Sequence, residues 1–151
     1  MSSQEQIRTD DAATYPKISL TLPGHWSRLR FDADVIAEIG AASAQVSQAA
    51  STAAAVRAAL AAAAADHPDR LWIRAYSDEI AVLALSWPRS GRFDTTTSTS
   101  PDPTLAHATY AITSPDGNAV LRLDHLVIAQ VATEHADPAW VESSLATLTW
   151  A

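Results

Sequence analysis

The chain contains five histidines, the residue type used most often for metal binding and acid–base catalysis, at His25, His67, His107, His125 and His135. No two of them have the HxH or HxxxH spacing that places two imidazoles on one face of a strand or helix. The chain also has no cysteine, which excludes a disulfide, a thiolate nucleophile and a cysteine metal ligand. The sequence therefore predicts no metal site and no cofactor.

One polar cluster is expected, from the Asp124-His125 pair together with His107. In the segment LRLDHLVIAQV (121–131), Leu121 and Leu123 before this pair occupy odd positions, whereas Leu126 and Ile128 after it occupy even positions. A β-bulge or turn at 124–125 would account for the change, with His107 on the facing hairpin. The cluster could serve a small-ligand carrier or an enzyme, but a polar pair at a register break is the simpler interpretation.

Motifs typical of other enzyme classes are missing. The sequence contains no GxSxG elbow, no P-loop and no GxGxxG, and it has only four glycines with which to build a phosphate-binding loop. No residue is therefore assigned a catalytic role, and the sequence favours a function other than catalysis.

Length and charge restrict the class of protein further. A chain of 151 residues is expected to form one domain, and a formal net charge of −7 with one lysine and scattered arginines argues against nucleic-acid binding. The first residues, MSSQEQIRTDDAAT, lack the apolar segment of a secretory signal, and no stretch is long and apolar enough to span a membrane. We expect a cytoplasmic protein with a disordered tail over 1–14 and one domain over 15–151.

Five tryptophans favour a protein partner. Those at positions 26, 72 and 140 are expected in the core. Trp87, beside a loop rich in Ser, Thr and Pro over 89–103, and Trp150, next to the last residue, are expected to be partly exposed. An exposed aromatic residue beside an adaptable loop is typical of a binding surface. Two tryptophans that cap the edge of the core are the simpler interpretation. The candidate partner-binding residues are Trp87, Arg89, Phe93 and Trp150.

The element pattern begins with two strand-like runs on either side of Pro23-Gly24. An alanine-rich helical region follows over 33–65, with Asp32 or Asp34 as its N-cap. A single helix of this length would be about 50 Å long, whereas a globule of this size is about 38 Å across. We therefore favour two helices with a break between residues 47 and 52. A single protruding helix, which would imply a partner helix, is the alternative.

Further strands are predicted over 71–76 and 80–87, followed by a hairpin of 107–113 and 119–123 around the turn at 114–118. The strand IAVLALSW is apolar on both faces, which is typical of a central strand covered on both sides. The final segment, DPAWVESSLATLTW, predicts a helix with an inward stripe formed by Val141, Leu145 and Leu148. The expected fold is α+β, a two-layer or α/β/α sandwich. It has a twisted antiparallel sheet, an Ala-rich helix or helix pair after the first hairpin, and a C-terminal helix packed on the sheet.

This order of elements, with SLTLPGHW near the start and LATLTW at the end, resembles the PsbP-like α/β/α sandwich, which includes the actinobacterial LpqN-type lipoproteins and the DcrB-type proteins. A strand followed by Pro-Gly and Trp recurs there, as does a closing helix beside the first strands. The resemblance implies a binding protein, an adaptor or a chaperone of secreted effectors rather than an enzyme. The chain departs from the lipoproteins because it has no signal peptide or lipobox cysteine, so an envelope location is not implied.

The leading functional expectation is therefore a non-enzymatic adaptor or chaperone that binds another protein or a second copy of itself. A structural subunit that docks through the Ala-rich helical region, with Val46 and Val56 at its interface, is a second interpretation. A small-ligand carrier or enzyme that uses His107, Asp124 and His125 is a third.

Overall fold

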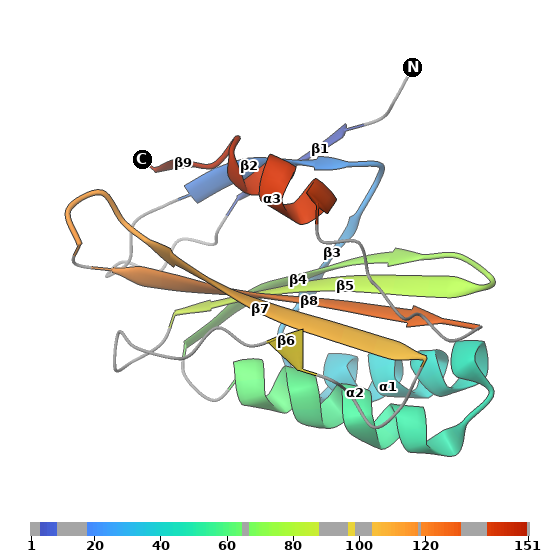
Figure 1. Cartoon of the computed structure of the whole chain (residues 1–151). Helices are drawn as coiled ribbons and strands as arrows, with labels where there is room; N and C mark the ends of the chain where they lie inside the picture. Colours follow the sequence, from blue (N-terminus) through green and yellow to red (C-terminus); the bar gives the residue numbers. More distant parts are fainter. Residues whose placement is uncertain are drawn as a thin grey trace.

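The computed structural model of the chain describes residues 4–8, 18–64, 67–87, 97–98, 104–117, 119–130 and 139–150. These residues form three layers (Figure 1): a pair of helices, a six-stranded sheet, and a three-stranded sheet with a short helix on the opposite face. All paired strands are antiparallel. The expected α+β class is confirmed.

The Ala-rich region forms two helices, α1 (Ala33–Ser47) and α2 (Ala50–Ala63), as predicted. Asp32 is the N-cap of α1, because its Oδ1 accepts a hydrogen bond from the backbone N–H of Val35 at 3.0 Å. Gln48 ends α1 in the left-handed conformation, with φ of 59°. The resulting short connection folds α2 back antiparallel to α1, which keeps both helices on the sheet.

The apolar stripe of the helix pair faces the six-stranded sheet. Ile39, Val56 and Leu60 are buried there, and Val46 packs against the same core. Of the two residues expected at a docking interface, Val56 is fully buried and Val46 is half-buried against the same core. The stripe therefore packs inside the fold, and docking of an assembly through the helical region stays a prediction. The helices hold no second apolar stripe of large residues because most of their remaining positions are alanine. Among the described residues, no helix is long and apolar enough to cross a membrane.

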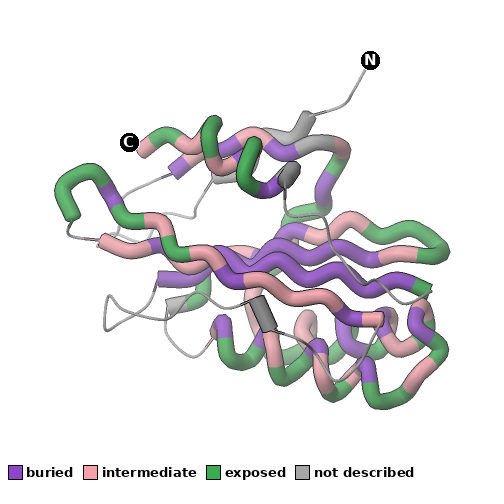
Figure 2. Tube along the Cα trace, viewed as in Figure 1, coloured by how far each residue is buried: buried purple, intermediate pink, exposed green. Residues whose placement is uncertain are grey.

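The six-stranded sheet has the order β3-β4-β5-β8-β7-β6. Its strands are β3 (Ser27–Arg30), β4 (His67–Ala75), β5 (Glu79–Trp87), β6 (Thr97–Ser98), β7 (Leu105–Thr113) and β8 (Val120–Ala129). Figure 2 shows that β5 and β8, in the middle of the sheet, are buried along most of their length. The prediction of a central strand at IAVLALSW is confirmed, as are the hairpins β4–β5 and β7–β8.

Strand β8 runs without interruption through Asp124 and His125, and its register with β5 and β7 shows no shift there. The bulge or turn expected at this point is therefore wrong. The apolar parity changes because both faces of β8 are covered. Leu123 packs under the three-stranded sheet, and Leu126 packs under the helices. Each face of the strand is apolar over a different part of its length.

The opposite face of the large sheet is covered by β1 (Gln4–Arg8), β2 (Ile18–Pro23), β9 (Thr149–Trp150) and α3 (Ala139–Leu145). The alternating apolar residues of β2 are buried against that sheet. Strand β1 pairs with β2 over all five of its residues, so the disorder expected for residues 1–14 is wrong at 4–8.

The turn at Pro23 and Gly24 carries the chain from one sheet to the other, since β2 and β3 pair with different strands. Gly24 has a φ of +82°, a conformation that glycine adopts without the steric cost of a side chain. At the other end of the chain, α3 is shorter than predicted and Trp150 lies in a strand. The inward packing of Val141, Leu145 and Leu148 is confirmed. The first two residues of the predicted helix, Asp137 and Pro138, lie outside the described residues.

The shortened helix is explained by Thr147. Its hydroxyl donates to the carbonyl of Ser144 at 2.6 Å and accepts from the backbone N–H of Thr21 at 2.9 Å. The Thr147 side chain thus ends the helix and provides a hydrogen-bond acceptor for one backbone N–H of β2. The chain then continues as β9, which pairs with β2.

Candidate functional site

A β-bulge in β4 organises the first candidate site. The register of β4 with β5 shifts between Pro68 and Leu71, so Asp69 and Arg70 together oppose a single residue of β5. The Asp69 carboxylate reaches Trp87 on β5, whose indole Nε1–H donates to Oδ2 at 3.3 Å. Bulges redirect side chains in this way, and here a carboxylate is turned toward the apolar core between the two sheets.

Asp69 is a buried carboxyl group with an unusual ionisation. Its residue is 8% exposed, and burial raises its pKa to about 6. The hydrogen bond from Trp87 and the positive charges of Arg70 and Arg28 oppose this increase without cancelling it. The side chain therefore titrates close to neutral pH.

Trp87 is 2% exposed, so the expectation of partial exposure is wrong for this residue. Its N–H is satisfied by Asp69 inside the fold, and its ring belongs to the core between the sheets. Trp150, in contrast, is half-buried. The two rings meet edge to face, with centroids 6.4 Å apart and planes at 60°. The structure thus brings Trp87 and Trp150 together, whereas Arg89 and Phe93 lie outside the described residues.

Three arginines lie on one face of the adjacent edge of the sheet. Arg30 of β3 pairs directly with Arg70 of β4, so the two side chains project from the same face, and Arg28 projects from that face two residues earlier. Arg28 and Arg30 are exposed, and Arg70 is half-buried. We call Arg28, Arg30 and Arg70 the arginine face. The sequence was interpreted as having scattered arginines, although the alternation in SRLR (27–30) was an available signal.

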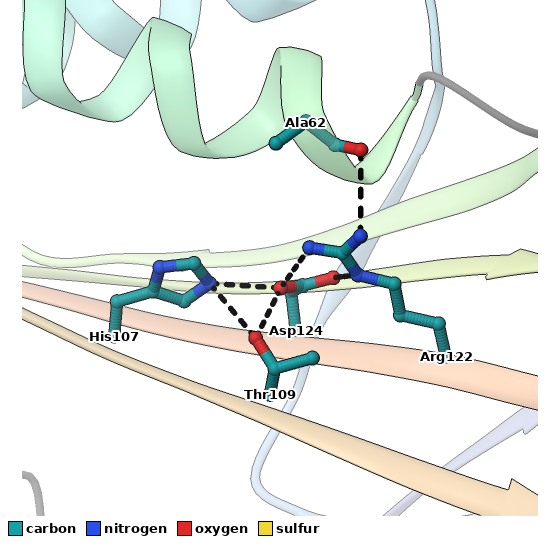
Figure 3. Close-up of polar contacts among 5 residues, drawn as sticks. All are labelled: Ala62, His107, Thr109, Arg122 and Asp124. Carbon is teal, nitrogen blue, oxygen red and sulfur yellow. Dashed lines mark hydrogen bonds and ion pairs between the residues drawn. The ribbon is translucent and has the colours of Figure 1, made fainter. Parts of the chain in front are cut away.

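A second polar group surrounds Asp124 on the face of the large sheet that carries the helices (Figure 3). Asp124 is fully buried, and its Oδ1 lies 2.8 Å from His107 Nε2 and accepts from the Thr109 hydroxyl at 2.8 Å. Arg122 donates from Nε to Oδ2 at 2.8 Å and from Nη2 to Oδ1 at 3.3 Å. We call these four residues the Asp124 network.

The contacts of Asp124 reverse the usual effect of burial. Burial alone would raise the pKa of Asp124, but hydrogen bonds from His107, Arg122 and Thr109, with the charge of Arg122, outweigh it and lower the pKa. Arg122 also donates from Nη1 to the carbonyl of Ala62 in the last turn of α2, at 3.5 Å. The carboxylate therefore links β7, β8 and, through Arg122, the end of α2.

His125 does not join this network. Neighbouring residues of a strand project from opposite faces, so His125 lies on the face toward the three-stranded sheet. It is 2% exposed, and burial lowers its pKa to about 4, with the charges of Arg74 and His107 contributing. Of the three residues in the predicted cluster, the structure brings together His107 and Asp124 only. The sequence missed Thr109, which lies directly opposite Asp124 on β7, and Arg122, which lies two residues earlier on β8 and on the same face.

The two groups differ in what they can do. Both oxygens of Asp124 are engaged by neighbouring side chains, which suits a link between structural layers better than a proton acceptor for a substrate. In the part of the chain that the structure describes, no three histidine, aspartate or glutamate side chains are grouped so as to hold a metal ion. The surface formed by Trp150 and the arginine face is the stronger candidate for a binding site.

Comparison with known proteins gives no family assignment: no family model matches the sequence, and neither a curated protein nor a solved structure matches it. The PsbP-like resemblance therefore stays a prediction.

Proposed function

We propose that this protein is a non-enzymatic adaptor or chaperone that binds another protein through Trp150 and the arginine face. The observation that carries the proposal is the fixed position of the half-buried Trp150 ring. Trp87 holds that ring edge to face, and Trp87 is itself held by its hydrogen bond to Asp69. A tryptophan held in this way loses little side-chain freedom when a partner covers it.

The composition of the surface supports the proposal. Tryptophan and arginine are the residue types most enriched among those that dominate the energy of protein–protein binding. Here the Asp69 carboxyl group accepts a hydrogen bond from Trp87, which contacts Trp150, and it interacts electrostatically with Arg70 and Arg28. The aromatic pair and the arginine face are thus linked through Asp69.

The class of partner belongs to the proposal as well. The PsbP-like resemblance implies adaptors and chaperones of secreted or effector proteins, and a cytoplasmic chaperone that holds such a protein is compatible with an acidic chain of 151 residues. The PsbP-like relationship and the cytoplasmic location are both part of what we propose.

Purification of the tagged protein from its native host, followed by mass spectrometry, tests the proposal. We expect one near-stoichiometric partner, and we expect Trp150→Ala to weaken its binding by about 2 kcal/mol, or roughly thirtyfold. Tyr76→Ala is the matched control because Tyr76 is also aromatic and is 58% exposed, at the turn between β4 and β5. Trp87 is unsuitable as a probe because it is part of the core.

Circular dichroism and urea unfolding of each variant establish that folding is retained. Trp150→Ala removes the ring contact with Trp87 and part of the packing against the core, which should cost about 2 kcal/mol of the free energy of unfolding. Recovery of the bare protein from the host, or equal recovery of the partner by wild type and the folded Trp150→Ala variant, would overturn the proposed function.

A further inference from the structure

We infer that the ionisation state of the Asp69 carboxyl group regulates partner binding: the ionised group holds the Trp87 and Trp150 rings in the binding position, and the protonated group releases them. This inference rests on the proposed function, since it concerns the regulation of the same surface. The two contacts involved are the hydrogen bond between Trp87 and Asp69 and the ring contact between Trp87 and Trp150.

Asp69 is a buried carboxyl group at an irregular point of the large sheet. The bulge between Pro68 and Leu71 interrupts the regular pairing of β4 with β5, and Asp69 is 8% exposed. Loss of water destabilises a buried carboxylate, so its ionised form depends on the groups around it. Among the contributions that favour the ionised form of Asp69, the largest is the hydrogen bond from the indole N–H of Trp87, which donates to Oδ2 at 3.3 Å.

The dependence between Asp69 and Trp87 is reciprocal. A hydrogen bond that favours the ionised carboxyl group over the protonated one is itself stronger when the group is ionised. Because burial raises the pKa of Asp69 to about 6, the carboxyl group gains its proton as the pH falls from 7.5 to 5.5. The hydrogen bond that fixes the Trp87 indole therefore weakens over this pH range.

The Trp87 ring transmits this change to Trp150. The two rings meet edge to face, with centroids 6.4 Å apart and planes at 60°, and the energy of such a pair depends on its orientation. Trp87 is enclosed in the core, whereas Trp150 is half-buried and belongs to the two-residue strand β9. A change in the tilt of the Trp87 ring therefore alters the position of the Trp150 ring, which forms the proposed contact with the partner.

The charged groups that act on Asp69 are Arg70, its neighbour on β4, and Arg28 on β3. Trp87, which contacts it from β5, is neutral, as is Trp150 behind that ring. Arginine side chains keep their charge throughout this pH range, so Asp69 is the member of this group that changes charge. Histidine is the other residue type that titrates near neutral pH, and the Asp69→Asn variant retains all five histidines.

Fluorine NMR of the full chain labelled with fluorotryptophan tests this link without a partner. The Trp150 resonance, assigned from a Trp150→Phe variant, should shift through one transition with a midpoint near pH 6 in wild type. Asp69→Asn should lose the transition because the amide does not titrate, and Trp87→Phe should lose it because the indole N–H is gone. Asp78→Asn, the same change at an exposed residue between β4 and β5, should keep it.

Partner affinity at two pH values tests the regulation itself. Wild type should bind the partner recovered from the host about fivefold more tightly at pH 7.5 than at pH 5.5, because a charge-assisted hydrogen bond is replaced by a neutral one. Asp69→Asn should bind equally at both values. Trp87→Phe retains the charge change at Asp69, so loss of the pH dependence in this variant as well assigns the effect to the hydrogen bond. Circular dichroism at both pH values establishes that each variant is folded.

The outcomes separate the regulation from the proposed function. A Trp150 resonance that does not titrate, or that titrates equally in the folded Trp87→Phe variant, would overturn the link through the hydrogen bond. If wild type binds its partner equally at both pH values, the regulation is wrong and the proposed function stands. Recovery of the bare protein from the host would overturn the proposed function and, with it, the regulation.

Discussion

Asparagine in place of Asp124 tests whether the Asp124 network holds the sheet and the helix layer together. The change keeps the shape of the side chain but removes the negative charge that faces Arg122 and His107. Removing one partner of a buried ion pair costs about 3–5 kcal/mol. The Arg122 side chain is 17% exposed and can reach water in part, so we expect a loss of about 2–4 kcal/mol in the free energy of unfolding.

Urea unfolding followed by tryptophan fluorescence and circular dichroism measures this loss. With a denaturant slope of about 2 kcal/mol per molar, the midpoint should fall by about 1–2 M. Thr109→Val is the matched control because it removes one neutral donor and leaves the charge, and it should cost only about 1 kcal/mol.

The pH dependence makes the same test sharper. Because the pKa of Asp124 is lowered in the folded state, its ionised form stabilises the fold above the unfolded-state pKa of 3.8. That contribution is lost as the pH falls through the lower folded-state pKa. The difference in stability between wild type and Asp124→Asn should therefore be full at pH 7 and should shrink below pH 3.8. A variant as stable as wild type at pH 7, or a difference that persists unchanged in acid, would refute the structural role of the network.

Two further outcomes follow from buried groups elsewhere. For Asp69, a folded-state pKa of about 6 against 3.8 means that the folded state holds its proton more tightly, so wild type should gain about 1 kcal/mol of stability between pH 7 and pH 5 relative to Asp69→Asn. An equal pH profile for the two proteins in urea unfolding would contradict the assigned burial. For Val56, which is fully buried, alanine should cost about 2 kcal/mol, and aspartate should prevent folding rather than dissociate an oligomer. Size-exclusion chromatography with circular dichroism distinguishes these results, and a folded monomeric Val56→Asp variant would show that the packing is wrong.

The helix pair could be predicted from the sequence because length and local signals agreed. A continuous helix over 33–65 is too long for the domain, and an aspartate stands where a cap is needed. What remained open was the choice between Asp32 and Asp34, which depends on one backbone hydrogen bond. The left-handed Gln48 that ends α1 carries no clear sequence signal, since glycine or asparagine is the usual residue there.

Strand β8 shows that the periodicity of apolar residues is not sufficient to predict whether a strand is straight or bulged. A change of apolar parity has two physical causes, a register break or a change in which face of a straight strand is covered. The second applies here, because Leu123 and Leu126 contact different layers. Which layers lie above a strand is a property of the whole fold, so the segment 121–131 alone could not decide between the two causes. Because the strand is straight, Asp124 and His125 lie on opposite faces of the sheet.

The candidate surface was predicted only in part, because the burial of its residues also depends on the whole fold. Trp87 and Trp150 of the predicted surface do meet, but the polar loop beside Trp87 predicts partial exposure of a residue that is buried. Its burial depends on Asp69, 18 residues earlier in the chain, which supplies an acceptor for the indole N–H. Asp69 reaches that position only through the bulge in β4, and a shift in strand register cannot be read from DHPDRLW (66–72) before the pairing partner is known.

The two buried carboxylates show why one site is assigned to structure and the other to binding. Asp124 is surrounded by charged and hydroxyl donors that stabilise its ionised form, so both of its carboxylate oxygens are engaged inside the fold. Asp69 accepts from the neutral indole of Trp87, and burial still dominates its ionisation. Protonation of Asp69 near pH 6 removes the negative charge beside Arg28 and Arg70. The charge of the arginine face therefore becomes more positive in the same pH range. If the arginine face takes part in partner binding, as proposed, the affinity for the partner should differ between pH 5.5 and pH 7.5 in wild type, and the Asp69→Asn variant should lose this difference.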